Sequence, residues 1–319
     1  MTFTPSATVK ETDSYGRPVY RSEHGETVTV LKDSISEAGD RLTSMEVRFY
    51  RGVLAEFNTH RAFSRNSASS RAIPVLKMIK KVLDDPYIPD YWGKYQKGMQ
   101  AHEEVSNPDE KVEQWLEGRD NAVKTALGLL YGDTYTDYMR KYLPVKVATE
   151  VLEVHDGLPD DAVHKQIANR VLEPYMWHTV LVTGTNWDNF FDLRNHEDAD
   201  PAIYQIAYQM QLAYEDSLPE ALDLGQWHLP LLDDNELEEI GIDTAKKISA
   251  ARCARVSYLT HDGVRSYEAD MALFNRLVQG KPHLSPLEHV ARPSATGRQA
   301  YGNFDGWIQY RGEMFGRTV

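Results

Sequence analysis

The sequence predicts a protein of mixed α and β structure, because its apolar residues recur with the periods of both kinds of element. Apolar and polar residues alternate over Thr27–Leu31 and Met45–Phe49, and the run Val180–Val182 is apolar throughout, which is typical of strands. Helical spacing of apolar residues is found in the segments 74–83, 108–131 and 160–172. The predicted fold class is therefore α/β, with strands and helices both contributing to the core.

Composition and charge narrow the class of protein. The chain has 319 residues, of which 41% are hydrophobic and 26% charged, as expected for a soluble globular protein with a substantial core. No apolar run approaches the roughly 20 residues of a membrane span, and Met1–Lys10 lacks the apolar centre of a signal peptide. The one cysteine, Cys253, excludes an internal disulfide and favours a reducing cytoplasm, that of the host if a phage encodes the protein. The net charge of −13 argues against a nucleic-acid-binding surface. We therefore expect neither a membrane nor a nucleic acid as partner, while a small anionic ligand stays possible.

The most unusual stretch is Glu56–Arg71, which gathers arginines, serines, a histidine and an asparagine without the apolar pattern of a strand or a helix. Guanidinium forks and serine hydroxyls suit the binding of a phosphate or a polarised carbonyl. A solvated basic loop is the alternative. The stretch lies between the strand expected at Met45–Phe49 and the helix expected after Pro74, and a polar loop between two core-forming elements is placed like a functional one. We therefore predict an anion-binding loop.

A second polar segment follows the apolar run Val180–Val182. The turn Thr183-Gly184-Thr185 leads into a helix that opens with asparagine and aspartate, and such a junction points backbone N–H groups outward. Arg194 lies at the end of this segment, where a guanidinium that stays charged could donate to a developing anion. Pairing with Asp192 or Glu197 on the helix surface is the alternative.

The last part of the chain, 245–319, contains two further polar segments, Ala250–Tyr258 and His283–His289. The histidines of the second segment could suggest a metal site, but Pro286 prevents a regular helix, so the two rings need not share a face. We therefore predict no metal. Gly302–Arg311 is predicted as an edge strand, and the acidic stretch 220–242 as a connection.

Taken together, these segments resemble the flavin-dependent thymidylate synthases. The signature of that family is Arg-His-Arg, seven residues and Ser, with Asn-Glu-x-Ser-Gly-Arg inside it. The positions that match are His60, Arg61, Asn66, Ser69 and Arg71. The chain departs from the signature at Glu56 in place of Gln, Thr59 in place of Arg, Ser67 in place of Glu and Ser70 in place of Gly.

Other segments extend the resemblance. Asn189 and Arg194 keep the spacing of the family's second flavin-binding segment, and Asn169–Pro174 is a loose counterpart of its Ala-Arg-x-Val-Leu-Pro. Ala250–Tyr258 and His283–His289 resemble Ala-Arg-Val-Ser and His-x-Ser/Thr-Pro-x-Glu-His, which in most members precede the arginine-rich loop. The chain therefore looks circularly permuted. Residues 1–319 would form one domain, in which 245–319 corresponds to the usual N-terminal part.

The resemblance implies an α+β fold with a central, mostly antiparallel sheet flanked by helices. It also implies a flavoprotein that transfers a one-carbon unit from 5,10-methylenetetrahydrofolate to C5 of a deoxypyrimidine monophosphate, with dUMP to dTMP as the first expectation. Reduced FAD would supply hydride and NADPH would re-reduce the flavin. The active sites would be shared among the subunits of a homotetramer.

The expected roles of individual residues also come from the resemblance. The catalytic residues would be Arg194, Ser69 and His60. The nucleotide would be bound by Glu56, Ser69, Ser70, Arg71, Arg170 and Arg194, with Gln309 and Arg311 replacing the side chains missing at Glu56 and Thr59. The flavin and folate would lie against His60, Arg61, Asn66, Ser67, Thr183, Thr185, Asn189, Ser257, His283, Ser285 and Glu288. Without the resemblance, Arg170 would be explained as a residue at a helix C-terminus that the helix dipole favours.

Two alternative functions stay open. Water could intercept the one-carbon adduct before hydride arrives, which would make a 5-hydroxymethyl nucleotide from dUMP or dCMP. The replacements in the signature motivate this alternative, since the carboxylate of Glu56 near the base could accept from an exocyclic amine. The other alternative is a catalytically silent protein that binds nucleotide or flavin, and it is motivated by the loss of charged motif residues.

Overall fold

The computed structural model describes residues 3–153, 157–256, 266–296 and 300–316, which divide into two compact units. Unit 1 takes its residues from Met1–Thr4, Tyr50–Leu54 and Ser69–His178. Unit 2 takes its residues from Pro5–Phe49, Ala55–Ala68 and Thr179–Val319. Most of the arginine-rich stretch therefore belongs to unit 2, whereas residues 69–71 belong to unit 1.

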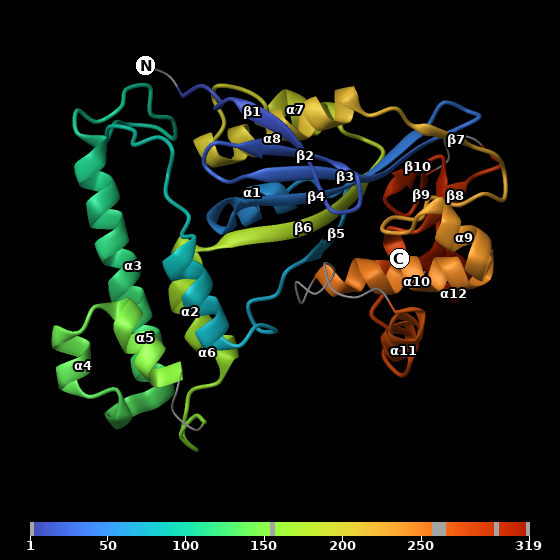
Figure 1. Ribbon diagram of the computed structural model, residues 1–319. Coiled ribbons are helices and arrows are strands. Elements are labelled where there is room, and N and C mark those ends of the chain that lie inside the picture. The colour runs from blue at the N-terminus through green and yellow to red at the C-terminus, as the bar shows by residue number, and fades with distance from the viewer. Residues whose placement is uncertain (1–2, 154–156, 257–265, 297–299, 317–319) are drawn as a thin grey trace. The chain divides into compact units, whose positions relative to one another are not determined.

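Unit 2 is built on a mostly antiparallel sheet (Figure 1). Among the described residues it has seven strands in the order β1-β2-β3-β4-β6-β5, with β7 beside β3. Their bounds are β1 Thr8–Thr12, β2 Pro18–Ser22, β3 Thr27–Ser36, β4 Arg41–Tyr50, β5 Ser64–Ser67, β6 Trp177–Gly184 and β7 Glu220–Leu222. The β3–β7 pair is parallel, whereas β1–β2, β2–β3, β3–β4 and β5–β6 are antiparallel. The predicted mixed fold with an antiparallel sheet flanked by helices is confirmed.

The long pair of strands β3 and β4 follows from the alternation in the sequence. Leu42, Met45, Val47 and Phe49 of β4 are fully buried, and Val28 of β3 stands opposite Val47. Burying a side chain of this size stabilises the fold by about 1.5–3 kcal/mol. Both strands predicted from alternation are confirmed, and each extends beyond the predicted range.

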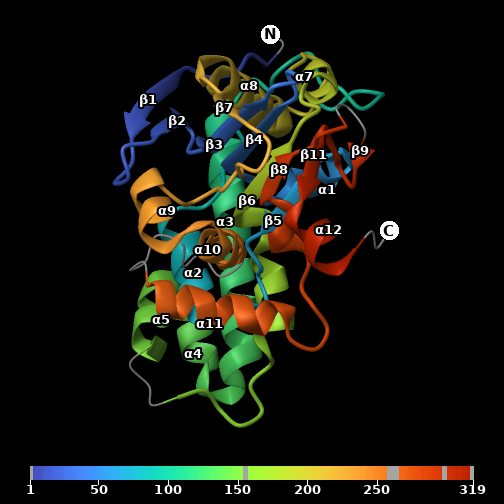
Figure 2. The same ribbon diagram turned by 90° about the vertical axis from the view of Figure 1, so that its right-hand side faces the viewer.

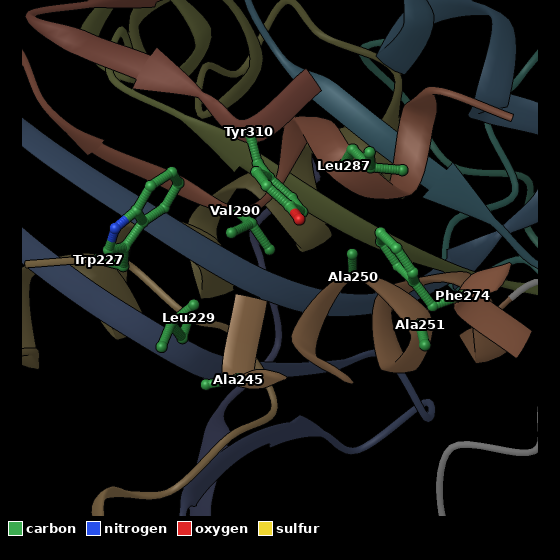
Figure 3. Packing of buried hydrophobic residues seen from close by; sticks show 9 residues of the cluster. All are labelled: Trp227, Leu229, Ala245, Ala250, Ala251, Phe274, Leu287, Val290 and Tyr310. Carbon is green, nitrogen blue, oxygen red and sulfur yellow. The ribbon is translucent and has the colours of Figure 1, made fainter. Parts of the chain in front are cut away.

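Helices flank this sheet and form a further core in unit 2. Their bounds are α1 Leu54–Asn58, α7 Asp188–Arg194, α8 Pro201–Asp216, α9 Asp234–Ile240, α10 Ile242–Arg255, α11 Tyr267–Val278 and α12 Tyr310–Phe315, with the 3-10 helix η5 at Ser285–Glu288. Helix α8 packs on β2 and β3, and α10 packs against α9, α11 and η5 (Figure 2). Figure 3 shows large side chains such as Trp227, Phe274 and Tyr310 gathered around the alanines of α10. Small residues on α10 let the neighbouring elements approach closely.

The single edge strand predicted at 302–311 is only partly right: the stretch begins with a turn, holds two short strands and ends in a helix. Short strands pair here as β8 Ala291–Pro293 with β11 Trp307–Gln309, and as β9 Ala300–Tyr301 with β10 Phe304–Asp305. After Gln309 the chain turns into α12, so Arg311 lies on a helix. The expectation of a simple connection at 220–242 is also wrong, because this stretch holds β7 and α9. The side chain of Asp233 and that of Glu236 form a capping box that starts α9.

The arginine-rich stretch is more regular than its composition predicts. Ser64–Ser67 forms β5, which pairs with β6 so that Ser64 stands opposite Thr183 and Asn66 opposite Leu181. Backbone hydrogen bonds to an existing strand can impose extended structure on polar residues, which explains why the apolar pattern was missing. The pairing places the arginine-rich stretch beside the second polar segment of the sequence.

Unit 1 consists mainly of α-helices, with short 3-10 helices and loops between them. The bounds are η1 Arg51–Val53, α2 Val75–Asp84, α3 Pro108–Tyr131, η2 Gly132–Thr134, α4 Asp137–Tyr142, α5 Val145–Glu153, α6 Lys165–Ala168 and η3 Asn169–Tyr175. The helices predicted at 74–83 and 108–131 are confirmed. The helix predicted at 160–172 is mostly wrong: His164 caps α6 from its start, and the chain tightens into η3 after Ala168. Nowhere in the described part of the chain is a helix both long and apolar enough to cross a membrane.

Candidate functional site

The most informative contact in unit 2 joins Arg194 to His60. Arg194 ends helix α7, and its Nε donates to Nε2 of His60 at 3.0 Å. Its Nη2 donates to the hydroxyl of Thr59 at 3.2 Å. Because Nε2 of His60 accepts, the ring carries its proton on Nδ1. Burial first, and then the charges of Arg194 and Arg65, lower the pKa of His60 to about 4, so the ring is neutral near pH 7.

Aromatic rings fix the position of His60. Phe190 meets the imidazole edge to face, with 4.9 Å between the ring centres, and Phe63 lies 6.1 Å away on the same measure. Phe190 also contacts Phe57 and Phe63. Helix α7 therefore supplies both Arg194 and Phe190, the ring that packs edge to face against His60. One helix thus helps to position both the guanidinium and the imidazole.

Arg65 is a site residue that sequence reasoning missed. Its Nη1 donates to the backbone carbonyls of His60 at 2.9 Å and Phe57 at 3.2 Å. Burial lowers the pKa of Arg65, an effect that the nearby charge of Glu288 opposes. Arg65 thus closes the turn that carries His60 and brings a half-buried positive charge to the site. The sequence signal was its place within the arginine-rich stretch.

A polar cluster connects this stretch to the end of the chain. Ser64 donates to Oε2 of Glu288 at 2.7 Å and accepts from Nε2 of Gln309 at 3.1 Å. Arg311 donates from Nη1 to Oε1 of Glu288 at 2.5 Å, and Asn303 donates to the Ser64 hydroxyl at 3.2 Å. Gln309 and Arg311 are thus held at Glu288. That they replace the side chains missing at Glu56 and Thr59 stays a prediction.

Behind the site runs a buried chain of hydrogen bonds. The Thr183 hydroxyl lies 2.6 Å from that of Ser44 and 2.8 Å from Nδ1 of His289. Ser44 in turn lies 2.8 Å from Nε2 of His228, whose Nδ1 lies 2.9 Å from the Ser34 hydroxyl. Burial lowers the pKa of His289 to about 3 and that of His228 well below its usual value, so both rings are neutral. The Thr183 side chain, predicted to contact the cofactor, is fully buried and engaged in this chain. No sequence signal pointed to His228.

Glu56 has an unusual environment. Its side chain is half-buried, and within the described residues its buried Oε2 has no hydrogen-bond partner. Its charge helps to raise the pKa of Asp200, although burial of Asp200 is the larger cause. A buried carboxylate oxygen without a donor is costly, and a bound N–H group would relieve that cost.

The other unit 2 residues that were predicted to bind the cofactor differ in their burial. Asn66 is buried and donates to the carbonyl of Cys253 at 3.2 Å, which ties β5 to α10. Burial raises the pKa of the Cys253 thiol, so this cysteine stays protonated.

The remaining predicted cofactor residues of unit 2 are less buried. The half-buried ones are Ser67 and Thr185, and the exposed ones are Arg61, Asn189, His283 and Ser285. Ser257 lies outside the described residues. In the described part of the chain, no group of three or more His, Cys, Asp or Glu could hold a metal ion.

Four of the residues predicted to bind the nucleotide lie in unit 1, namely Ser69, Ser70, Arg71 and Arg170. Ser70 donates to Oε1 of Glu173 at 3.3 Å, and Nη1 of Arg170 lies 3.9 Å from the same oxygen. Asn169 is buried, and its amide donates to the backbone carbonyls of Ser70 at 2.6 Å and Ile73 at 3.0 Å. Ser69 is half-buried and Arg71 exposed. Unit 1 thus gathers Ser70 and Arg170 at Glu173, a residue that the sequence had not singled out.

Of three comparisons with known proteins, only the one with solved structures gives matches. No protein-family model and no curated protein matches the chain. Among solved structures, a UMP/dUMP methylase, PolB from Streptomyces cacaoi, is similar in its complexes with 5-Br dUMP and 5-Br UMP. The first covers 60% of this chain and 90% of the methylase at 14% identity, and its TM-score is 0.43. The second covers 60% of this chain and 89% of the methylase at 15% identity, also with a TM-score of 0.43. At these values the likeness is too weak to assign a function.

Proposed function

We propose that the chain is a flavin-dependent enzyme that transfers a one-carbon unit from methylenetetrahydrofolate to C5 of a deoxypyrimidine monophosphate, with dUMP as the first candidate. The observation that carries this proposal is the bond between Arg194 and His60. It joins the two segments that the resemblance assigns to the pyrimidine and to the flavin. The Ser64–Glu288 bond adds the third segment to the same unit.

The side chains of unit 2 fit a flavin by their chemistry. The exposed Arg61, Asn189, His283 and Ser285 offer donors for phosphate and ring oxygens. Bound reduced FAD would supply the hydride that completes transfer to C5. The active enzyme would be a homotetramer, with NADPH re-reducing the flavin.

Arg194 would stabilise the negative charge that develops on the pyrimidine ring. Reaction at C5 of the pyrimidine requires negative charge to develop on the ring, and a guanidinium that stays protonated can donate to that charge. Because neutral His60 accepts from Nε without cancelling the charge, Arg194 is oriented and yet remains a full cation. In the described residues its Nη1 makes no hydrogen bond, so this nitrogen would be available to a bound substrate.

A second candidate function is 5-hydroxymethylation, with dCMP as substrate. The unpartnered Oε2 of Glu56 favours it. Cytosine presents an exocyclic amine that can donate to a carboxylate, whereas uracil presents a carbonyl at the same ring position, and two acceptors would repel each other. Water rather than hydride would then take the one-carbon adduct.

The experiment is product analysis by mass spectrometry. Purified, FAD-loaded protein is incubated with methylenetetrahydrofolate and NADPH, with dUMP and dCMP in separate tubes. A methyl gain on dUMP supports the first function, and a hydroxymethyl gain on either nucleotide supports the second. Arg194→Lys protein and tubes without folate serve as controls. FAD bound without any product would leave a catalytically silent binding protein and overturn both proposals.

A further inference from the structure

A cavity lies in unit 2, at the edge of the core that surrounds α10. Its volume of about 360 Å³ is within the range of roughly 300–1,000 Å³ that is typical of pockets for small molecules. All the residues that line it belong to unit 2, and none of them was predicted to bind the nucleotide or the flavin. A ligand of this cavity would therefore occupy a second site, distinct from the one around Arg194 and His60.

Much of the cavity wall is apolar. Trp227 and Leu229 are buried members of the α10 core, and the half-buried Leu232 and Leu237 pack against the same core. Figure 3 shows Trp227 and Leu229 together on the left of this core, with Phe274 on its right. An indole ring and leucine side chains favour a ligand with an aromatic or aliphatic body, because they remove its apolar surface from water.

The charged part of the lining is acidic. It consists of three carboxylates and one ammonium group, those of Glu220, Asp233, Asp234 and Lys32. Nζ of Lys32 lies 2.6 Å from Oε2 of Glu220 but 3.9 Å from Oδ1 of Asp234, at the limit of an ion pair. Asp233 is engaged elsewhere, since its Oδ1 accepts from the backbone N–H of Glu236 at 2.9 Å. The single ammonium group thus leaves the lining with an excess of negative charge.

We propose that this cavity binds a small organic cation, in which an ammonium group is carried on an aromatic or aliphatic body. The body would lie against Trp227 and Leu237, and the ammonium group would be held by the carboxylates of Asp234 and Glu220. The excess negative charge disfavours an anion of the same size, and a neutral molecule gains nothing from it. Lys32 competes with the ligand for the same carboxylates, so it lowers the affinity.

Calorimetric titration of the full-length protein with phenethylamine, phenethyl alcohol and hydrocinnamate tests this proposal. These compounds share a phenyl ring on a short chain, and their end groups are positively charged, neutral and negatively charged. We expect the amine to bind most tightly and the carboxylate most weakly. Tighter binding of the carboxylate would assign the cavity to anions held by Lys32 and overturn the proposal. Equal binding of the amine and the alcohol, or no binding of the amine, would overturn it as well.

Two charge variants of the lining locate the bound ammonium group. Asp234→Asn removes one carboxylate and should raise the Kd for phenethylamine by roughly threefold, the scale of an exposed ion pair, because the Asp234 side chain is 85% exposed. Lys32→Met removes the competing charge and should lower the same Kd by a similar factor. The Kd for phenethyl alcohol should not change in Asp234→Asn. Weaker binding of the amine to a folded Lys32→Met protein would contradict the proposed competition.

Glu238→Gln is the matched control, because Glu238 is an exposed carboxylate of the same helix α9 and is not among the residues that line the cavity. Its Kd for the amine should equal that of the wild type, and a loss equal to that of Asp234→Asn would reduce the effect to net charge and overturn the proposal. Leu237→Trp fills the cavity and should abolish binding of the amine and the alcohol. Leu232→Phe replaces it if circular dichroism shows that it does not fold. Unchanged binding in the folded variant would place the amine outside the cavity.

Discussion

Arg194 and His60 are separated by 134 positions in the sequence, yet Nε of the first donates to Nε2 of the second at 3.0 Å. A positively charged donor next to a histidine could not be held if the histidine were also protonated. Burial, which lowers the pKa of His60, therefore favours the pair, and the rings of Phe63 and Phe190 pack against His60.

Replacing Arg194 should abolish most of the activity. Arg194→Lys loses the donor fork that faces both His60 and the substrate, and we expect kcat/KM to fall by about 100-fold or more, as for other donors that stabilise developing charge. His60→Gln should retain more activity than His60→Leu, because Gln can still accept from Nε. Steady-state turnover measures both effects. Arg292→Lys is the control, because Arg292 is a half-buried arginine that is likewise held by a side chain, that of Glu313. Wild-type rates in Arg194→Lys would exclude an electrostatic role for this residue.

Glu56→Gln should change which nucleotide is preferred. The amide can donate to the carbonyl of uracil, whereas the carboxylate can only accept. We expect the ratio of kcat/KM for dCMP to that for dUMP to fall by about tenfold or more, on the scale at which one buried hydrogen bond discriminates between substrates. Competition between the two nucleotides in one tube measures this ratio directly. An unchanged ratio would mean that Glu56 does not face the base.

Thr183→Val should destabilise unit 2. The substitution keeps the shape of the side chain but leaves the buried Ser44 hydroxyl and Nδ1 of His289 each without this partner, at a cost of about 1–3 kcal/mol in the free energy of unfolding. Thr183→Ser keeps the hydroxyl and loses a methyl group, so it should cost about 1 kcal/mol. Urea denaturation of the two variants gives the comparison. Equal stability of both would show that the hydrogen-bond chain contributes nothing.

The free energy of unfolding should fall as the pH falls from about 6.5 to 4. The pKa is lowered to about 4 for His60 and to about 3 for His178 and His289, and it lies well below 6.5 for His228. In this range the unfolded chain binds more protons at these histidines than the folded chain does, so acid favours unfolding. Urea midpoints at several pH values measure the slope.

Two histidine variants separate this effect from general acid denaturation. His178→Asn removes one buried ring and should make the slope shallower between pH 6.5 and 4. His196→Asn should leave it unchanged, because the His196 side chain is 54% exposed. Identical slopes in the two variants would contradict the assignment of the pH dependence to buried histidines.

Local sequence patterns predicted some helices and strands correctly and missed others. The helices α2 and α3 were predicted with nearly correct bounds, because each has an apolar stripe with helical period and needs no partner to be recognised. Strand β5 was missed, since its residues are polar and its extended form comes from pairing with β6. Helix α9 was missed as well, although the capping box of Asp233 and Glu236 is visible in the sequence.

The sequence by itself determined the chemistry of this protein: the arginine-rich stretch, the strand-to-helix junction that ends in Arg194 and the polar segment that contains Glu288. Only the tertiary structure decided which of these groups meet. Arg194 with His60, Ser64 with Glu288, and Arg51 with Glu173 are contacts between residues far apart in the chain. Residue type and spacing report the local preference for burial and secondary structure, whereas such contacts depend on the path of the whole backbone. The same path sets the burial that keeps His60 neutral and leaves a carboxylate oxygen of Glu56 without a donor in the described part of the chain.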